Sequence, residues 1–182
     1  MKKIVAASAV VLGLGLTGLA FAGGDTPVAA SSPSGLGVSF NFSTINEDQA
    51  FLGLDYRTNG FEGGVMANSE WGDWHSDAEA TSNHTDVQAY LGMVRPMSSH
   101  VDVSFGAQGD FRWYSDDAGK DYHPWEAGLY AGMNYNPTAH FSIMNRLSLV
   151  SYKAYNTDGK NGKQKGAIYA AFNATIGCAY FF

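Results

Sequence analysis

Two groups of residues in this chain combine a hydroxyl with an imidazole, the pair that nucleophilic catalysis uses. His140 and Ser142 are two positions apart, which would place both side chains on one face of a strand. Ser115, Asp116 and His123 fall together in a polar stretch. A serine acts as a nucleophile only when a base lies within hydrogen-bond reach. Spacing does not establish that contact, so Ser115, Asp116 and His123 are catalytic candidates only if the protein is an enzyme.

Metal binding is a second chemistry that the sequence could support, in the segment from Ser69 to Thr85. This segment carries His75, Asp77, Glu79 and His84. Imidazole and carboxylate groups bind divalent metals, but their mixed spacing here fixes no ligand geometry. We interpret the segment as a polar surface loop and predict neither a metal site nor a cofactor.

Strands are the elements that must position these residues, because large apolar residues alternate with small or polar ones in eight segments. The clearest is 101–113, in which residues such as Val103 face one way and residues such as Ser104 the other. In 141–150 the apolar register also contains Asn145, which predicts a bulge or a tolerated polar residue. The segments are 36–42, 52–57, 61–68, 87–93, 101–113, 125–135, 141–150 and 168–182.

The connections between these segments are of two kinds. Short ones occur at 58–60, where Asn59-Gly60 suits a type I′ hairpin, and at 95–99 and 136–139. Longer polar connections occupy 43–49, 69–85, 115–123 and 155–164. Membrane barrels have short turns at one end and long loops at the other.

We therefore predict an all-β fold, an eight-stranded antiparallel up-and-down transmembrane β-barrel. Its apolar registers would face lipid and its polar registers the lumen, and the even number of strands would place both chain ends beside the short turns. A water-soluble sandwich or lipocalin-like barrel is the alternative, and it would bury the apolar faces instead.

The inward registers collect charged and amide side chains. A barrel of eight strands is just wide enough for side chains to fill it, and buried charges need partners, so we predict a hydrogen-bonded and charge-paired plug. A gated pore is the alternative interpretation. The predicted interior network comprises Asp55, Arg57, Glu62, Asp102, Gln108, Asp110, Arg112, Glu126 and Arg146.

Aromatic residues gather near the ends of the predicted strands. Amphipathic rings favour the headgroup level of a bilayer, so two interfacial girdles are expected. The predicted girdle residues are Tyr56, Phe61, Trp113, Trp125, Tyr135, Tyr180 and Phe182.

The last eight residues carry the most specific motif, Thr175-x-Gly177-x-x-Tyr180-x-Phe182. This spacing resembles the C-terminal assembly signal of bacterial outer-membrane barrels. From Leu36 to Phe182 the chain resembles the small eight-stranded outer-membrane barrels of the OmpA/OmpX type. The resemblance implies insertion by the barrel-assembly machinery and residence in the outer membrane of a Gram-negative bacterium with both termini in the periplasm. It implies no shared ligand, because fold and function are separable.

The N-terminus has the features of a signal peptide. Lys2 and Lys3 precede an uncharged apolar run, and Ala20-Phe21-Ala22 presents small residues as a cleavage site does. We predict that residues 1–22 are removed, that 23–34 form a flexible leader, and that 35–182 form the barrel domain.

Composition argues against one class of partner and against a disulfide. Without Lys2 and Lys3 the 11 basic residues fall to 9 against 17 acidic ones, a net charge of −8, which disfavours nucleic acid. The single cysteine, Cys178, excludes a disulfide within the chain. Lys160 and Lys163 could contact lipopolysaccharide phosphates, although solvated lysines are the plainer interpretation.

These observations predict a monomeric, non-enzymatic barrel that serves envelope integrity or surface interaction. Its partners would be outer-membrane lipid and lipopolysaccharide, with an extracellular ligand bound through the long loops. One alternative is an enzyme that modifies lipid A, of the deacylase or acyltransferase type, since such enzymes use His with Ser near the outer leaflet. A narrow channel for small solutes is a further alternative.

Overall fold

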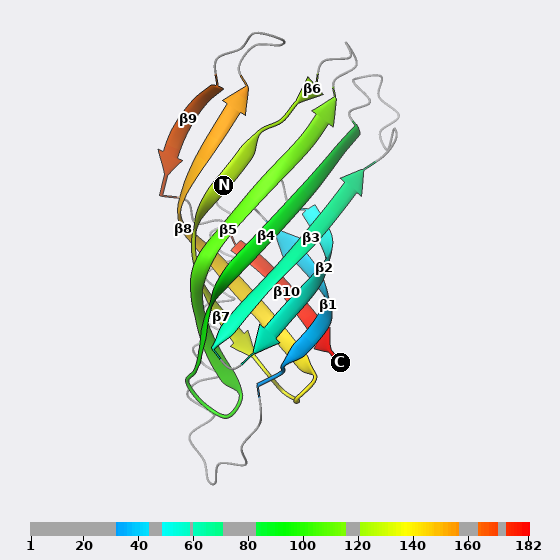
Figure 1. Ribbon diagram of the computed structural model, residues 1–182, viewed down its shortest axis with the longest axis vertical. Helices are drawn as coiled ribbons and strands as arrows, with labels where there is room; N and C mark the ends of the chain where they lie inside the picture. Colours follow the sequence, from blue (N-terminus) through cyan, green and yellow to red (C-terminus); the bar gives the residue numbers. More distant parts are fainter. Residues whose placement is uncertain are drawn as a thin grey trace, which may run out of the picture.

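The computed structural model describes residues 32–43, 49–58, 60–70, 83–115, 121–156, 164–170 and 174–182. All regular structure in these ranges is β, in one antiparallel sheet that closes on itself (Figure 1). The strands are β1 (Gly35–Ser43), β2 (Gln49–Thr58), β3 (Phe61–Glu70), β4 (Asn83–Pro96), β5 (Val101–Ser115), β6 (Asp121–Tyr122), β7 (Trp125–Tyr135), β8 (Phe141–Asn156), β9 (Gln164–Tyr169) and β10 (Ala174–Phe181).

Eight strands run around the barrel, although ten segments are defined. β6 is a two-residue strand that pairs only with the end of β5. β9 and β10 both pair with β8, β9 along its C-terminal part and β10 along its N-terminal part. β10 also pairs with β1, which closes the sheet. The predicted fold class, an eight-stranded antiparallel up-and-down barrel, is confirmed.

The eighth strand was predicted as one continuous segment, 168–182, but the structure has two segments there, β9 and β10. Ser151 is opposite Tyr169, whereas Leu147 is opposite Ala174, so the register of the two parts differs by one residue. Residues 171–173 lie outside the described part of the chain.

One end of the barrel carries the short connections. Thr58 pairs with Phe61 across a two-residue loop, and Gly60 has the positive φ, 111°, that such a turn requires. Residues 97–100 and 136–140 form the other two turns, and β1 begins and β10 ends at this same end (Figure 1). We call it the turn end. We call the opposite end the loop end, because the four predicted long loops connect the strands there. Most of the residues of these loops are outside the described ranges.

A bulge is present in β8, but at a different residue from the one that prompted its prediction. Leu129 pairs with Val150 and Tyr130 with Ser148, so Leu149 is the additional residue. Both Leu149 and Val150 are exposed. Asn145 keeps its outward register as a tolerated polar residue. The extra residue restores the alternation beyond it, so β8 continues well past the expected end at 150.

Burial is inverted relative to a water-soluble protein. Leu52 and Leu54 are 71% and 58% exposed on the outer wall, whereas Arg57 is 1% and Glu62 2% exposed inside. Most of the buried side chains are therefore polar or charged, and the large side chains on the outer wall are mostly apolar. This is the arrangement that a transmembrane barrel requires. Among the described residues, no helix is long and apolar enough to cross a membrane.

Several described side chains depart from the simple alternation, and the large apolar residues Phe51, Met66 and Met144 are buried inside. Val101 was expected to face outward but is buried, because the turn before it folds back and its carbonyl accepts hydrogen bonds from the amides of Met97 and Ser98. Ala174, also expected outward, is buried beside the irregular part of the eighth strand. Phe181 is a large apolar residue on the inward register and is 1% exposed.

Candidate functional site

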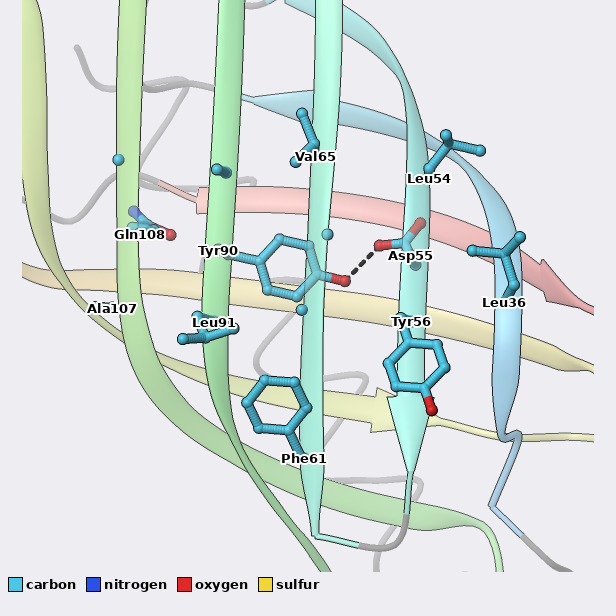
Figure 2. A pocket seen from close by; sticks show the side chains of 14 residues that line it. Leu36, Leu54, Asp55, Tyr56, Phe61, Val65, Tyr90, Leu91, Ala107 and Gln108 are labelled. Atoms are coloured by element: carbon cyan, nitrogen blue, oxygen red, sulfur yellow. Dashed lines mark hydrogen bonds between the residues drawn. The ribbon is translucent and has the colours of Figure 1, made fainter.

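The middle of the barrel is occupied by two tyrosines that lie over glycines. The Tyr90 hydroxyl donates a hydrogen bond to Asp55 Oδ1 (Figure 2). A Cβ at Gly64 would lie 2.6 Å from the Tyr90 ring, so only glycine leaves room for the ring. The Arg146 guanidinium carbon lies 3.6 Å from the Tyr90 ring centroid, a cation–π contact. The Tyr130 ring meets the edge of Tyr90 at 6.1 Å.

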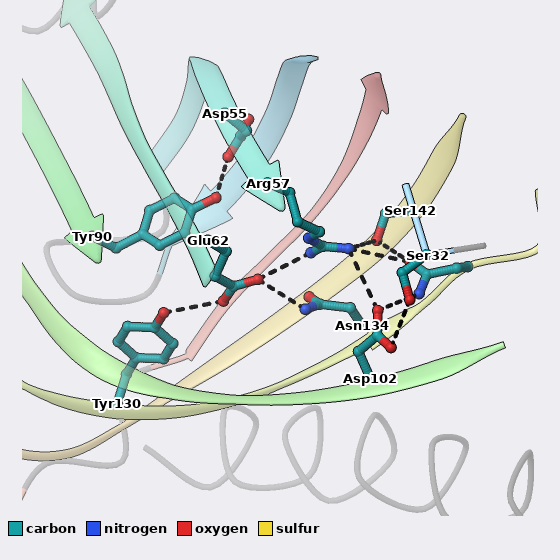
Figure 3. Close-up of polar contacts among 10 residues, drawn as sticks. Ser32, Asp55, Arg57, Glu62, Tyr90, Asp102, Tyr130, Asn134 and Ser142 are labelled. Carbon is teal, nitrogen blue, oxygen red and sulfur yellow. Dashed lines mark hydrogen bonds and ion pairs between the residues drawn. The ribbon is translucent and has the colours of Figure 1, made fainter. Parts of the chain in front are cut away.

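A charged cluster fills the turn end of the lumen, and Arg57 is at its centre (Figure 3). Arg57 Nη2 donates to Glu62 Oε2 at 3.0 Å, and Nη1 lies 3.9 Å from Asp102 Oδ2. Nη1 also donates to Asn136 Oδ1 at 3.3 Å and to Ser142 Oγ at 3.4 Å. One side chain from β2 therefore contacts β3, β5, β8 and the turn between β7 and β8.

Glu62 is held by further donors. Tyr130 donates to Oε1 and Asn134 donates to Oε2, each at 3.0 Å. Both carboxylate oxygens are therefore bonded, which a buried acid needs if its desolvation is to be offset.

The chain before β1 completes this cluster. The Ser32 hydroxyl donates to Asp102 Oδ1 at 2.9 Å, while Asn136 Nδ2 donates to Oδ2 at 2.7 Å. Pro33 is fully buried. Ser32 and Pro33 belong to the segment predicted to be a flexible leader, but they lie against the barrel interior. Residues 23–31 of that leader are outside the described ranges.

Charge pairing continues toward the loop end. Arg112 forms a bidentate pair with Asp86, with Nε and Nη2 lying 2.6 and 2.9 Å from the two carboxylate oxygens. Asp110 and Glu126 are opposite each other on β5 and β7, and both are buried. The gap beside them has room for about 10 Å³ only.

All of the predicted interior residues lie on the inner face. Asp55, Arg57, Glu62, Asp102, Asp110, Glu126 and Arg146 are buried, and Gln108 and Arg112 are partly exposed. Within the described ranges these side chains occupy the lumen from the turn end to the level of Asp110, and the gap beside Asp110 and Glu126 is small. The arrangement can brace the barrel and can block solutes.

Several members of the network were not predicted as site residues. Tyr90 and Tyr130 lie on the inward registers, so alternation alone could have identified them. Asn136 and Ser32 lie outside any periodic segment, and Phe181 has the wrong chemistry for the inward register. The Arg57 guanidinium lies 5.3 Å from the Phe181 ring centroid, which gives this aromatic side chain a role inside the barrel.

His140 and Ser142 are not brought together. His140 lies in a turn, where its Nδ1 is 3.0 Å from the Phe181 carbonyl oxygen, while Ser142 faces the lumen and donates to Asn136. The hypothesis that these two share a face of one strand is therefore wrong. His123 is exposed and stacks on Phe111 on the outer side, with ring centroids 6.1 Å apart. Asp116 and the side chain of Ser115 lie outside the described residues.

The possibility of a metal site can be examined only for the described residues. Within the ranges that the structure describes, no three His, Cys, Asp or Glu side chains are grouped so that they could hold a metal ion. Residues 71–82, which contain most of the predicted polar loop, are outside those ranges.

The predicted girdle residues point outward. Tyr180 and Phe182 are 50% and 71% exposed and meet edge to face at 5.7 Å. The remaining members, Tyr56, Phe61, Trp113, Trp125 and Tyr135, are exposed or partly exposed. In the terminal motif, Thr175 is buried on the inner face, and Gly177 leaves room for the side chain of Asn41. The role of this motif in assembly stays a prediction.

Fold and interior together define the class of this molecule: a closed eight-stranded antiparallel barrel with an apolar outer wall and a filled polar interior, the architecture of small transmembrane barrels. No protein-family model matches the sequence, and no curated protein matches it either.

Solved structures with similar chain paths are outer-membrane proteins. Neisserial surface protein A is 13% identical, with a TM-score of 0.45, and the match covers 81% of this chain and 94% of that one. A major outer membrane protein from Thermus thermophilus is 14% identical, with a TM-score of 0.42 and coverages of 81% and 98%. Ail, the attachment invasion locus protein of Yersinia pestis, solved with a heparin analogue, is 17% identical, with a TM-score of 0.38 and coverages of 80% and 93%. These values describe resemblance alone.

Proposed function

We propose that this protein resides in the outer membrane of a Gram-negative bacterium as a closed monomeric barrel that acts through its surface. It serves envelope integrity or surface interaction, with its termini in the periplasm and its long loops outside the cell. Lipid and lipopolysaccharide surround it, the barrel-assembly machinery inserts it, and any extracellular ligand binds through the loops.

The observation that carries this proposal is the set of contacts made by Arg57. Its guanidinium reaches Glu62, Asp102 and Asn136 across the lumen, and all four side chains are at most 2% exposed. Opening a path here would leave buried charges without partners, which costs about 3–5 kcal/mol for each broken pair. A solute path is therefore disfavoured, and the surface is left as the working part of the molecule.

Conductance in planar bilayers tests the closed interior. We expect no steady openings from the unaltered protein. Openings are expected only when deletion of residues 23–33, Arg57→Ser and Glu62→Ser are combined with Tyr90→Ser and Tyr130→Ser, because the two tyrosines occupy the middle of the lumen. Steady, porin-sized currents from the unaltered protein would contradict the proposal.

Cysteine labelling on whole cells tests the orientation. In a Cys178→Ala background, Ser76→Cys in a predicted long loop should react with a membrane-impermeant maleimide. Ser98→Cys at the turn end is the matched control and should react only after the outer membrane is permeabilised. The reverse pattern would place the loops in the periplasm and exclude a role at the cell surface.

The surface role itself is tested in a strain that lacks the protein. This strain should be more sensitive to bile salts, and the full chain should restore its resistance. A chain with residues 71–82 replaced by a Gly-Ser linker separates the two roles: rescue assigns envelope integrity to the barrel wall, and failure assigns the role to the loop. A change in the acyl chains of lipid A that depends on this protein would instead establish the enzymatic alternative.

A further inference from the structure

A shallow groove crosses the outer wall over β1 to β5 (Figure 2). Its volume is about 670 Å³, within the roughly 300–1,000 Å³ of typical ligand pockets. The outward side chains around it are Leu36, Leu54, Tyr56, Phe61, Val65 and Leu91.

Small residues on outward positions create the depression. Gly63 has no side chain, so Leu91 lies over it, with its Cδ1 3.1 Å from the place a Cβ would occupy. Gly109 is open, since a Cβ there would meet only the Glu126 carbonyl oxygen at 3.4 Å. Ala89 and Ala107 are the other low points. Large apolar side chains project around these low points, so the groove offers an apolar surface on which a flexible hydrocarbon chain can lie.

A cation lies on the same face beyond the turn end of this groove. Phe61, which lines the groove, pairs with Met93, and Arg95 is two positions further along the outer face of β4. Two residues of a strand span roughly 7 Å. Arg95 is exposed, and no described carboxylate forms an ion pair with it. Figure 2 shows the Tyr56 hydroxyl directed toward the same end of the barrel.

We propose that this groove and Arg95 form a binding site for one phospholipid of the surrounding bilayer. An acyl chain lies in the groove, and the phosphate diester is held by Arg95, with the Tyr56 hydroxyl as a second donor. The depth of the parts fits, because tyrosine and arginine near strand ends occupy the headgroup level whereas the groove lies within the hydrocarbon. The charge also fits, because an arginine fork matches phosphate oxygens.

The choice of a phospholipid over a second copy of this chain rests on Arg95. An apolar groove alone would suit either occupant. A copy of the same wall would bring a second Arg95 toward the first in a symmetric contact, whereas a phosphate neutralises the charge. The proposal rests on the membrane location of the barrel, and it adds a specific ligand to the proposed function.

Native mass spectrometry of the full chain released from detergent micelles tests the site. The probes are dioleoyl phosphatidylglycerol and dioleoylglycerol, which has the same acyl chains but no phosphate. We expect one phosphatidylglycerol to be retained and dioleoylglycerol to be lost. Arg95→Gln should lower retention about tenfold, the scale of one charge-assisted hydrogen bond, and Arg95→Lys should keep most of it.

Groove filling supplies the second arm. Ala89→Leu with Ala107→Leu should lower retention as strongly as Arg95→Gln, whereas Ala131→Leu on β7, outside the groove, should leave it unchanged. Equal retention by the unaltered protein and Arg95→Gln would overturn the proposal. So would equal loss with Ala131→Leu, or a dimer that the groove-filling variant dissociates. Because the assay uses micelles, its failure would leave the proposed cellular location untouched.

Discussion

At the scale of single residues, each buried charged side chain stabilises the barrel only through its hydrogen-bond and ion-pair partners. The sequence identified which residues face inward, because alternation is a local property that each strand carries by itself. The sequence could not identify which side chains are hydrogen-bond or ion-pair partners. Arg57 finds Asn136 and Ser142, which are 79 and 85 positions away, and Ser32 finds Asp102 at a distance of 70 positions. Such pairs are defined only by closure of the barrel.

Replacing Arg57 tests the value of this pairing. Arg57→Met leaves the buried carboxylates of Glu62 and Asp102 without their cation, so the free energy of unfolding should fall by about 3–5 kcal/mol. The measurement is urea unfolding in phospholipid-free micelles, followed by tryptophan fluorescence. Arg95→Met is the matched control on the exposed outer face and should change stability by no more than about 0.5 kcal/mol. Similar losses in both variants would argue against a stabilising cluster.

At the scale of elements, regular strands were predictable and irregular ones were not. The apolar and polar registers of β1 to β5 and of β7 follow from period-2 alternation, as do the short turns with Gly60 and the prolines. β6 lies in a segment that was predicted as a long loop, and a strand of two residues is too short to show a period. The bulge at Leu149 and the register change before Ala174 were not located, because an extra residue changes the alternation without leaving a distinctive residue type. The catalytic pairing of His140 with Ser142 failed for a related reason: His140 lies before the strand begins.

Glycines on β3 and β5 test how the wall accommodates the interior. A Cβ at Gly64 would lie 2.7 Å from Asp55 Oδ1 and 2.9 Å from the Leu54 carbonyl oxygen, so Gly64→Ala should destabilise the barrel by about 1–3 kcal/mol. Gly109→Ala meets nothing closer than 3.4 Å and should be neutral or slightly stabilising. Thermal unfolding of the two variants in the same detergent distinguishes them. A larger loss at Gly109 would mean that the interior packing differs from this description.

At the scale of the whole molecule, the inverted distribution of polarity was the most predictable feature. It depends on the sum of eight strands, so an error at Val101 or Ala174 does not change the conclusion. The site was less predictable than the fold. Inward charges were identified as a group, whereas the closing contribution of Ser32 and Pro33 came from a segment whose composition predicted flexibility.

A charge on the outer wall tests whether this surface faces hydrocarbon. Leu54 is 58% exposed, and Leu54→Arg should cost about 2–4 kcal/mol in lipid vesicles if the position lies near the bilayer midplane. Met97→Arg in a turn is the control; Met97 is 59% exposed, and its replacement should be close to neutral. The readout is the free energy of unfolding from vesicles. Equal and negligible effects are what a water-soluble barrel would show.

Arg57 lies on the second strand to be made, yet the groups that compensate it come from β3, β5, the residue just after β7, and β8. In an open, half-curled sheet the adjoining strand already supplies Glu62, which is opposite Arg57 in the register, but the contacts of Arg57 with Asp102, Asn136 and Ser142 are unmade. Only the completed cylinder supplies these remaining partners, and a slipped register loses them. The cluster thus acts as an internal criterion of correct assembly, because arrested or misaligned intermediates leave polar groups unsatisfied until closure.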